Sequence, residues 1–177
     1  VTGQTPFPSC LCVSINDEIV HGPAIPSRTL NEGDIVSLDI GMKYKNMFTD
    51  TAVTVGVGKI SKEAKHLIKI TRQALERGIK EVKPGAYIHN ISEAVEKFVV
   101  KNGYQTIRDY VGHGVGHGVH EPPQVPNYVA ERFKEVKIEP GLCIAIEPMV
   151  VMGSPKTAHS PDAHGFETKD KSLSAHF

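Results

Sequence analysis

The chain has 177 residues, of which 40% are hydrophobic and 23% are charged, enough for one domain with a buried core. Lys plus Arg equals Asp plus Glu at 20 each, so the sequence carries no basic footprint for nucleic acid or for an anionic membrane. Three cysteines make no disulfide framework, and neither a signal peptide nor a spanning apolar run is seen. We therefore expect a cytoplasmic protein.

The first predicted elements are short strands. A turn over residues 7–9 precedes an alternating strand over residues 10–15. Residues 16–17 predict a hairpin turn, with residues 18–21 as its return strand. His21 ends that strand, and a lone histidine at such an edge is more often structural than catalytic.

Two further strands are predicted over residues 35–40 and 47–55, joined by a polar turn. They place Asp39 and Asp50 on neighbouring, paired strands. Two aspartates that meet in a largely apolar setting repel each other, so one must hold a proton unless a cation lies between them. Each alone is an ordinary surface residue, and together they are a candidate metal site.

The middle of the chain, about residues 61–103, has helical patterning. Ser61 is the predicted N-cap of a first helix, which ends at the Lys-Pro-Gly of residues 83–85. A second helix is predicted to begin at Asn90, with Glu93 completing a capping box. Apolar stripes at helical spacing belong to the core, so we assign these helices no chemistry.

A glycine-rich stretch at residues 111–123 reads V-G-H-G-V-G-H-G-V-H-E-P-P and carries His113, His117 and His120. Glycine lets the backbone approach closely, and the closing proline pair excludes a helix or a central strand. Imidazole is a frequent metal ligand and a proton shuttle near neutral pH, which favours a functional site. The alternative is a glycine loop with solvated histidines.

The last third of the chain returns to strands, and residues 139–147 repeat the pattern of residues 31–39. Each segment runs from a glycine to a carboxylate six residues later, which places Asp39 and Glu147 on equivalent faces. The alternative is chance recurrence of a short pattern.

Three carboxylates and one imidazole make a hard, oxygen-rich donor set that suits a pair of divalent ions bridged by carboxylates. The residues of this set are Asp39, Asp50, His113 and Glu147. A structural zinc site is excluded because Cys10 and Cys12 would need two further partners.

Together these segments resemble the type I methionine aminopeptidases, metallopeptidases of the pita-bread fold. The resemblance covers essentially the whole chain, in the segments F-P-S-C-L-C-V-S-I-N-D-E-I-V-H-G (7–22), E-G-D-I-V-S-L-D-I-G (32–41), F-T-D-T-A (48–52), G-H-G-V-G-H-G-V-H-E-P-P (112–123), I-E-P-M-V (146–150) and T-K-D-K-S-L-S-A-H-F (168–177). It implies an α+β fold of two pseudo-symmetric halves of antiparallel strands, with helices packed on the outer face. A single catalytic domain, residues 1–177, would place first-half strands at about 1–57, helices at about 61–103 and second-half strands at about 106–177.

The resemblance also implies a reaction, the removal of N-terminal methionine from peptides and nascent proteins, with a preference for small second residues. The implied protein is a cytoplasmic monomer that acts near the ribosome and uses two divalent ions, Co, Mn, Fe or Zn. The implied metal ligands are Asp39, Asp50, His113 and Glu147, with Glu147 also as general base. The implied substrate-binding residues are Phe7, Cys12, His21 and His120, of which His21 and His120 are also catalytic.

Two departures from the family pattern stand out. The family has a further glutamate ligand, which would directly follow Phe177, so we expect this chain to be truncated, as it also is at its first end. Many relatives have a tryptophan near the pocket, where this chain offers His164 and Phe166.

Two alternative functions remain open. The first is a proline-specific aminopeptidase or dipeptidase of the same fold, against which the I-E-P-M segment argues. The second is a metal-free binding protein that keeps the fold, against which the four intact ligands argue.

Overall fold

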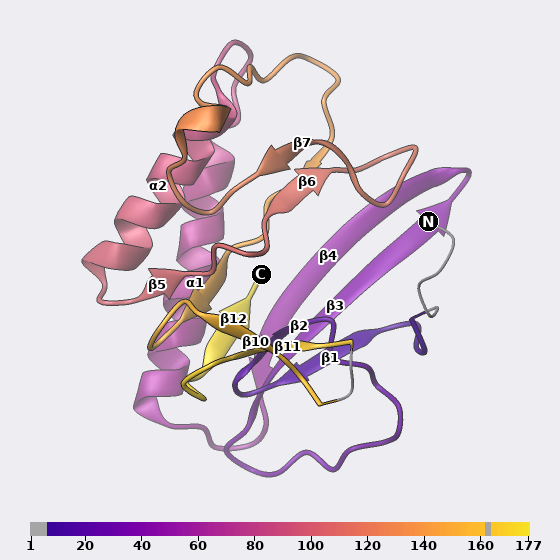
Figure 1. Cartoon of the computed structure of the whole chain (residues 1–177), viewed down its shortest axis with the longest axis vertical. Coiled ribbons are helices and arrows are strands. Elements are labelled where there is room, and N and C mark those ends of the chain that lie inside the picture. Colours follow the sequence, from indigo (N-terminus) through magenta and orange to yellow (C-terminus); the bar gives the residue numbers. More distant parts are fainter. Residues whose placement is uncertain (1–6, 162–163) are drawn as a thin grey trace.

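The computed structural model describes residues 7–161 and 164–177. The described α-helices, α1 (Lys62–Lys80) and α2 (Ile88–Lys101), lie together along one side of the molecule, and the strands occupy the other (Figure 1). A 3-10 turn, η1 (Glu131–Phe133), precedes the last group of strands. This arrangement confirms the predicted α+β class.

The described strands form four three-stranded sheets, and all of their pairings are antiparallel. The first sheet has the order β1 (Cys12–Ile15), β3 (Ile35–Tyr44), β4 (Met47–Gly56). The second has the order β10 (Thr157–His159), β11 (Phe166–Thr168), β2 (Glu18–Val20). The third has the order β12 (Ser174–His176), β9 (Met149–Val151), β5 (Gln105–Thr106). The fourth has the order β7 (Glu121–Val125), β6 (Gly112–Gly114), β8 (Ile144–Ala145).

The predicted hairpin over residues 10–21 is only partly correct. Its turn and both strands exist, and the Val13 N–H donates to the Gly22 carbonyl oxygen at 2.7 Å, but β1 and β2 belong to different sheets. β1 pairs with β3, whereas β2 leaves it and pairs with β11. The reason lies in burial, since Ile19 and Val20 of β2 are at most 4% exposed. They pack in a cluster with Ile107, Met149 and Val151, so their burial places β2 against strands from the second half of the chain.

The helix starts show one correct prediction and one error. Ser61 is the N-cap of α1, and its hydroxyl accepts a hydrogen bond from the Ala64 N–H at 3.0 Å. α2 begins at Ile88 rather than at Asn90. The Asn90 side chain accepts a hydrogen bond from the Tyr87 N–H at 2.8 Å, so it caps the helix from its third residue.

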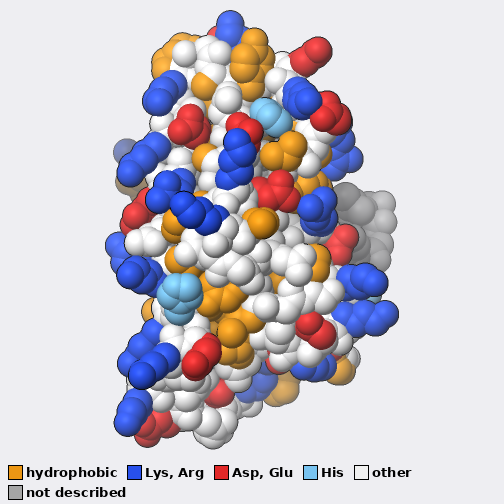
Figure 2. Space-filling view, turned by 90° about the vertical axis from the view of Figure 1, so that its left-hand side faces the viewer, with side chains coloured by type: hydrophobic (Ala, Val, Ile, Leu, Met, Phe, Trp, Pro, Cys, Tyr) orange, Lys and Arg blue, Asp and Glu red, His pale blue; other side chains and the backbone are white. Residues whose placement is uncertain are grey.

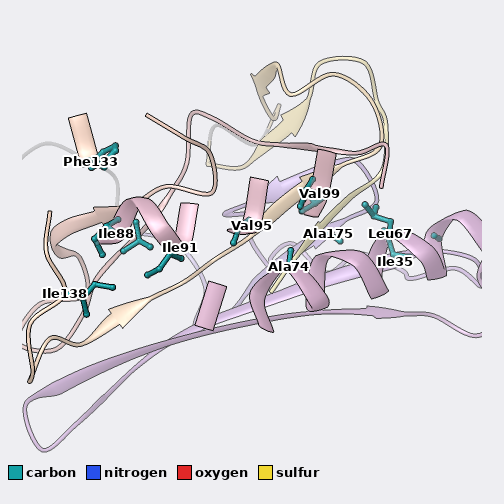
Figure 3. Close-up of a cluster of buried hydrophobic side chains, with 13 residues drawn as sticks. Ile35, Leu67, Ala74, Ile88, Ile91, Val95, Val99, Phe133, Ile138 and Ala175 are labelled. Carbon is teal, nitrogen blue, oxygen red and sulfur yellow. The ribbon is translucent and has the colours of Figure 1, made fainter. Parts of the chain in front are cut away.

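The main hydrophobic core lies between the two helices and the strands behind them (Figure 3). α1 contributes Leu67 and Ala74, and α2 contributes a stripe that includes Ile91 and Val95, all fully buried. Full burial of each such large aliphatic side chain is worth about 1.5–3 kcal/mol. Ile35 of β3 and Ala175 of β12 belong to the same core, which therefore fixes two sheets relative to the helices.

The outer face of the helices is solvated. Figure 2 shows both Lys or Arg and Asp or Glu side chains on this face, with the Lys and Arg side chains more numerous along its left part. Exposed ion pairs one helical turn apart, Arg72 with Glu76 and Lys97 with Glu93, are part of that mixture. Within the described residues, no helix is long and apolar enough to cross a membrane.

Candidate metal centre

The β3–β4 ladder brings the two predicted aspartates to one face. Asp39 lies opposite Ala52, and Asp50 is two residues from Ala52 along β4. Because strand side chains alternate, Asp39 and Asp50 are diagonal neighbours on the same side of the sheet. Burial raises the pKa of Asp39 above its ordinary value, and the charges of Asp50 and Glu147 raise it further against the opposing His176. This pair is therefore electrostatically strained unless a cation or a proton relieves it.

His113 occupies the middle strand of the fourth sheet and is 9% exposed. Its Nδ1 lies 2.8 Å from the Gly114 carbonyl oxygen, which can only accept, so Nδ1 donates and Nε2 faces the site. Nε2 is 3.1 Å from Glu147 Oε1 and 3.6 Å from Asp50 Oδ2. Burial alone would lower the pKa of His113, but these two carboxylates outweigh it and raise the pKa to about 10.

The glycines that flank His113 allow its neighbours to come close. A Cβ on Gly112 would lie 2.3 Å from the Ala145 carbonyl oxygen, and one on Gly114 would lie 2.3 Å from the Pro122 carbonyl oxygen. Either contact would push apart the strands of the fourth sheet. The predicted close backbone approach is therefore confirmed, and it is directed at neighbouring strands.

Glu147 follows β8, the other neighbour of β6. Its backbone carbonyl accepts a hydrogen bond from Asn127 Nδ2 at 2.6 Å, which fixes the segment after the strand. Burial would raise the pKa of Glu147, but His113 and His176 more than compensate and hold it below its ordinary value. Glu147 therefore stays ionised at neutral pH, as a ligand or a general base requires.

His120 and His21 approach the same centre from two other segments. The His120 ring is exposed, with its centroid 4.4 Å from that of His113. His21 follows β2 in a left-handed backbone conformation, φ 59°. Burial lowers the pKa of His21, His176 and His120 lower it further, and Glu147 and Asp50 oppose the shift, so this imidazole is neutral at pH 7. His117, also predicted as a site candidate, is exposed and lies outside the strands.

The two predicted pocket residues, Phe7 and Cys12, have different surroundings. Cys12 pairs with Asp39 in the β1–β3 ladder. Burial, followed by the charges of Asp39 and Asp50, raises the pKa of the Cys12 thiol to about 12, so the thiol is uncharged. Phe7 is 39% exposed, and its ring centroid lies 5.8 Å from that of His164.

The donor set fits a divalent metal ion. One ligand atom from each of Asp50, His113 and His120 lies within 4.8 Å of the other two. Glu147 Oε1 lies 3.1 Å from His113 Nε2. Carboxylates that repel each other in a partly buried setting are stabilised by a hard cation, and imidazole is compatible with Mn, Fe, Co and Zn. The one group of three close ligand residues found in the described part of the chain contains no cysteine.

His176 is the residue of this region that the sequence did not identify. It is 1% exposed on β12, and its Nε2 lies 3.5 Å from Glu147 Oε2. One signal was available, a single imidazole within the otherwise small and apolar run of residues 173–177.

Comparison with known proteins decides the family. Residues 2–171 match the metallopeptidase family M24. The chain belongs to this family. Methionine aminopeptidase 1 of Bacillus subtilis is 43% identical to this M24 chain over 176 residues, which cover 99% of the chain and 70% of that relative.

Solved structures agree with the assignment to M24. The methionine aminopeptidase of Thermotoga maritima has a TM-score of 0.90 and 42% identity, covering 94% of this chain and 67% of that one. The prolidase of Thermococcus sibiricus is less similar, with a TM-score of 0.66 and 27% identity over 79% of this chain and 37% of its own. The M24 chain thus spans about two thirds of the methionine aminopeptidases cited, and the predicted pita-bread fold is confirmed.

Proposed function

We propose that this M24 chain is a metal-dependent methionine aminopeptidase, with residues 1–177 as a single catalytic domain. The observation that carries the proposal is the convergence of Asp50, His113 and His120 within 4.8 Å, with Glu147 Oε1 3.1 Å from His113 Nε2. The identity of 43% to a methionine aminopeptidase over nearly the whole chain supports the choice of substrate.

The donor set supports two divalent ions, drawn from Co, Mn, Fe and Zn. When bound, such ions supply a nucleophilic water at neutral pH and a positive centre for the substrate's free amino terminus. The ligands we assign are Asp39, Asp50, His113 and Glu147. Of these, Asp50 and His113 belong to the close group, Glu147 lies beside His113, and Asp39 shares the sheet face of Asp50, whereas His120, the third member of the close group, is assigned to the substrate. Glu147 is ionised and faces the centre, so it is placed to take the proton of the attacking water and to pass it to the leaving amine.

The two remaining histidines act on the substrate. His120 is exposed beside His113, where its N–H can donate to the amide oxygen as negative charge develops. Such a donor is worth about 3–4 kcal/mol in the transition state. His21 is neutral, so one ring nitrogen donates and the other accepts, and we assign it to the peptide nitrogen or to the backbone of the second residue.

Phe7 and Cys12 supply apolar and uncharged surface for the methionine side chain. A protonated thiol and an aromatic ring suit a thioether, which is polarizable and unbranched. His21 is flanked by Tyr110 at 5.8 Å and Phe166 at 6.0 Å between ring centroids, and these rings crowd the space around it. An oversized second residue there costs about 1–3 kcal/mol, which is the basis for a preference for small second residues.

We further propose that the protein is a cytoplasmic monomer that acts on N-terminal peptides and on nascent chains near the ribosome. All three cysteines are free, which suits a reducing compartment. Lys plus Arg equals Asp plus Glu at 20 each, so the chain has no excess of positive charge that would favour binding of nucleic acid.

A peptide panel tests the function. The full-length protein that contains this chain, supplied with manganese or cobalt, is assayed on peptides with methionine, leucine or alanine first and glycine, leucine or proline second. We expect Met-Gly peptides to exceed Met-Leu peptides by about one to two decades in rate. The matched control is Asp50→Ala, which should bind no metal and release no methionine.

Two other outcomes would refute the proposal. Preference for proline in the second position, whatever the first residue, would favour the proline-specific function of the prolidase-like relatives. Absence of turnover by the full-length, metal-loaded protein would favour a binding protein.

A further inference from the structure

A buried imidazole without a partner faces the metal centre. His176 is 1% exposed, and neither of its ring nitrogens has a hydrogen-bond partner among the described residues. A polar group left unpaired in the interior is destabilising, so a buried histidine of this kind needs an explanation. Its Nε2 lies 3.5 Å from Glu147 Oε2.

The backbone of His176 is held firmly in place. Thr54 Oγ1 accepts a hydrogen bond from the His176 N–H at 2.8 Å and donates one to the His176 carbonyl oxygen at 2.8 Å. The hydroxyl has a single hydrogen, so the 2.8 Å contact between Thr54 and Ser37 must be donated by Ser37. Every hydrogen-bonding position of Thr54 Oγ1 is thus occupied, and β12 is fixed against the β3–β4 pair.

Strand register directs the two side chains toward each other. His176 lies opposite Met149 in the β12–β9 ladder, and Glu147 is two residues before Met149. Opposed residues and residues two apart share one face of a sheet. The Phe177 N–H also donates to the Pro148 carbonyl oxygen at 3.3 Å, which continues the pairing toward Glu147. Glu147 therefore has an imidazole near each carboxylate oxygen, His113 near Oε1 and His176 near Oε2.

We propose that His176 is a positioning residue of the metal centre, whose Nε2–H donates to Glu147 Oε2 and holds the carboxylate with Oε1 toward His113. This inference rests on the proposed function. A separation of 3.5 Å is longer than an ordinary N–H···O hydrogen bond. In the proposal, a small rotation of the Glu147 carboxylate on metal binding shortens this contact to a hydrogen bond. We assign His176 to Glu147 rather than to the metal, because its Nε2 approaches the carboxylate oxygen Oε2 of Glu147, and the cobalt spectrum of His176→Gln distinguishes the two roles.

Three substitutions and one control test the proposal. His176→Gln keeps an N–H donor of similar reach, His176→Asn keeps an amide that is too short, and His176→Leu removes the donor while filling the space. Ser174→Ala is the matched control, because Ser174 lies on the same face of β12 and its buried hydroxyl has no partner among the described residues. Manganese affinity is measured by calorimetry, the cobalt form is examined by visible absorption, and kcat and KM are measured on a Met-Ala peptide.

We expect His176→Leu and His176→Asn to weaken manganese binding about 10- to 100-fold and to lower kcat with little change in KM, since ligand-orienting contacts have effects of this size. We expect His176→Gln to stay within about threefold of the parent chain, with an unchanged cobalt spectrum. Ser174→Ala should match the parent chain in every measurement.

Three results would overturn the proposal. Parent-like manganese affinity in His176→Asn or His176→Leu would make His176 a packing residue. Weak manganese binding by His176→Gln together with an altered cobalt spectrum would show that His176 is a metal ligand. An equal loss of manganese affinity in Ser174→Ala would show that the effect comes from disturbing β12 and not from the imidazole of His176. Affinity is measured without substrate, so a chain that binds manganese but releases no methionine refutes the proposed function and leaves His176 to be judged by the affinity series.

Discussion

The protonation of His113 makes metal binding depend steeply on pH. The carboxylates of Asp50 and Glu147 raise the pKa of this imidazole to about 10, so in the metal-free chain it carries a proton at pH 7. A metal ion needs the neutral imidazole and must displace that proton. The affinity for metal therefore rises with pH.

The size of the effect follows from the position of the pKa. Between pH 6.5 and 8.5 the imidazole stays below its pKa of about 10, so each pH unit changes the fraction of neutral His113 about tenfold. The manganese dissociation constant should fall about 100-fold over this range. Calorimetry in two buffers of different ionisation enthalpy should show release of about one proton per chain at pH 7.5.

His113→Asn provides the control, since it replaces the titrating ring with a group that does not ionise. Its weaker manganese binding should be nearly flat with pH. A parent chain whose manganese affinity is independent of pH, or whose binding enthalpy is the same in both buffers, would refute this reasoning.

The same proton affects the stability of the metal-free fold. A raised pKa means that the folded chain binds the proton more tightly than the unfolded chain does. The stabilisation of the folded chain by protonated His113 is fully present below the ordinary pKa of 6.5 and is lost as pH rises through the folded-state pKa of about 10. The free energy of unfolding of the metal-free chain, measured in urea, should therefore fall as pH rises across this window. His113→Asn should lack this part of the pH dependence.

Three further substitutions have defined outcomes. His120→Ala should lower kcat about 100-fold, because it removes a donor to the substrate, and should leave the melting temperature unchanged, because the side chain is exposed. Activity equal to that of the parent chain would show that His120 has no catalytic role. Leu67→Ala should lower the free energy of unfolding by about 2–5 kcal/mol, because Leu67 is 0% exposed in the core; urea denaturation measures this, and a loss below that range would show that the core refills the space. Ser61→Ala should cost about 1 kcal/mol through the lost cap on α1, an effect that Ser61→Asp should avoid.

Local patterns were enough to predict the parts of the site that local structure determines. Asp39 and Asp50 lie on consecutive strands joined by a short turn, so their common face follows from the register of one hairpin. Ser61 was recognised as a cap because its partner, the Ala64 N–H, is three residues away. In both cases the partners are close in sequence, and the relevant periodicity is visible.

Long-range partners account for the failures. β2 was assigned to β1 because they are neighbours in sequence, whereas its partner β11 lies more than a hundred residues later and is selected by the burial of Ile19 and Val20. His176 escaped notice for the same reason, since its importance depends on β9 and on Thr54 rather than on its own strand. Burial and partner choice of this kind are properties of the tertiary fold.

The hydroxyl of Thr54 also bears on the order in which the chain folds. It joins Thr54 to His176 across 122 residues, and the loop between them must close before either hydrogen bond can form. The Asp39–Asp50 hairpin and the two packed helices require only local contacts, so they can form first. The complete set of groups around Glu147 is therefore assembled late, and the first half of the chain, emerging alone during synthesis, lacks His113, Glu147 and His176. We therefore expect a newly made chain to bind metal only after both halves have come together.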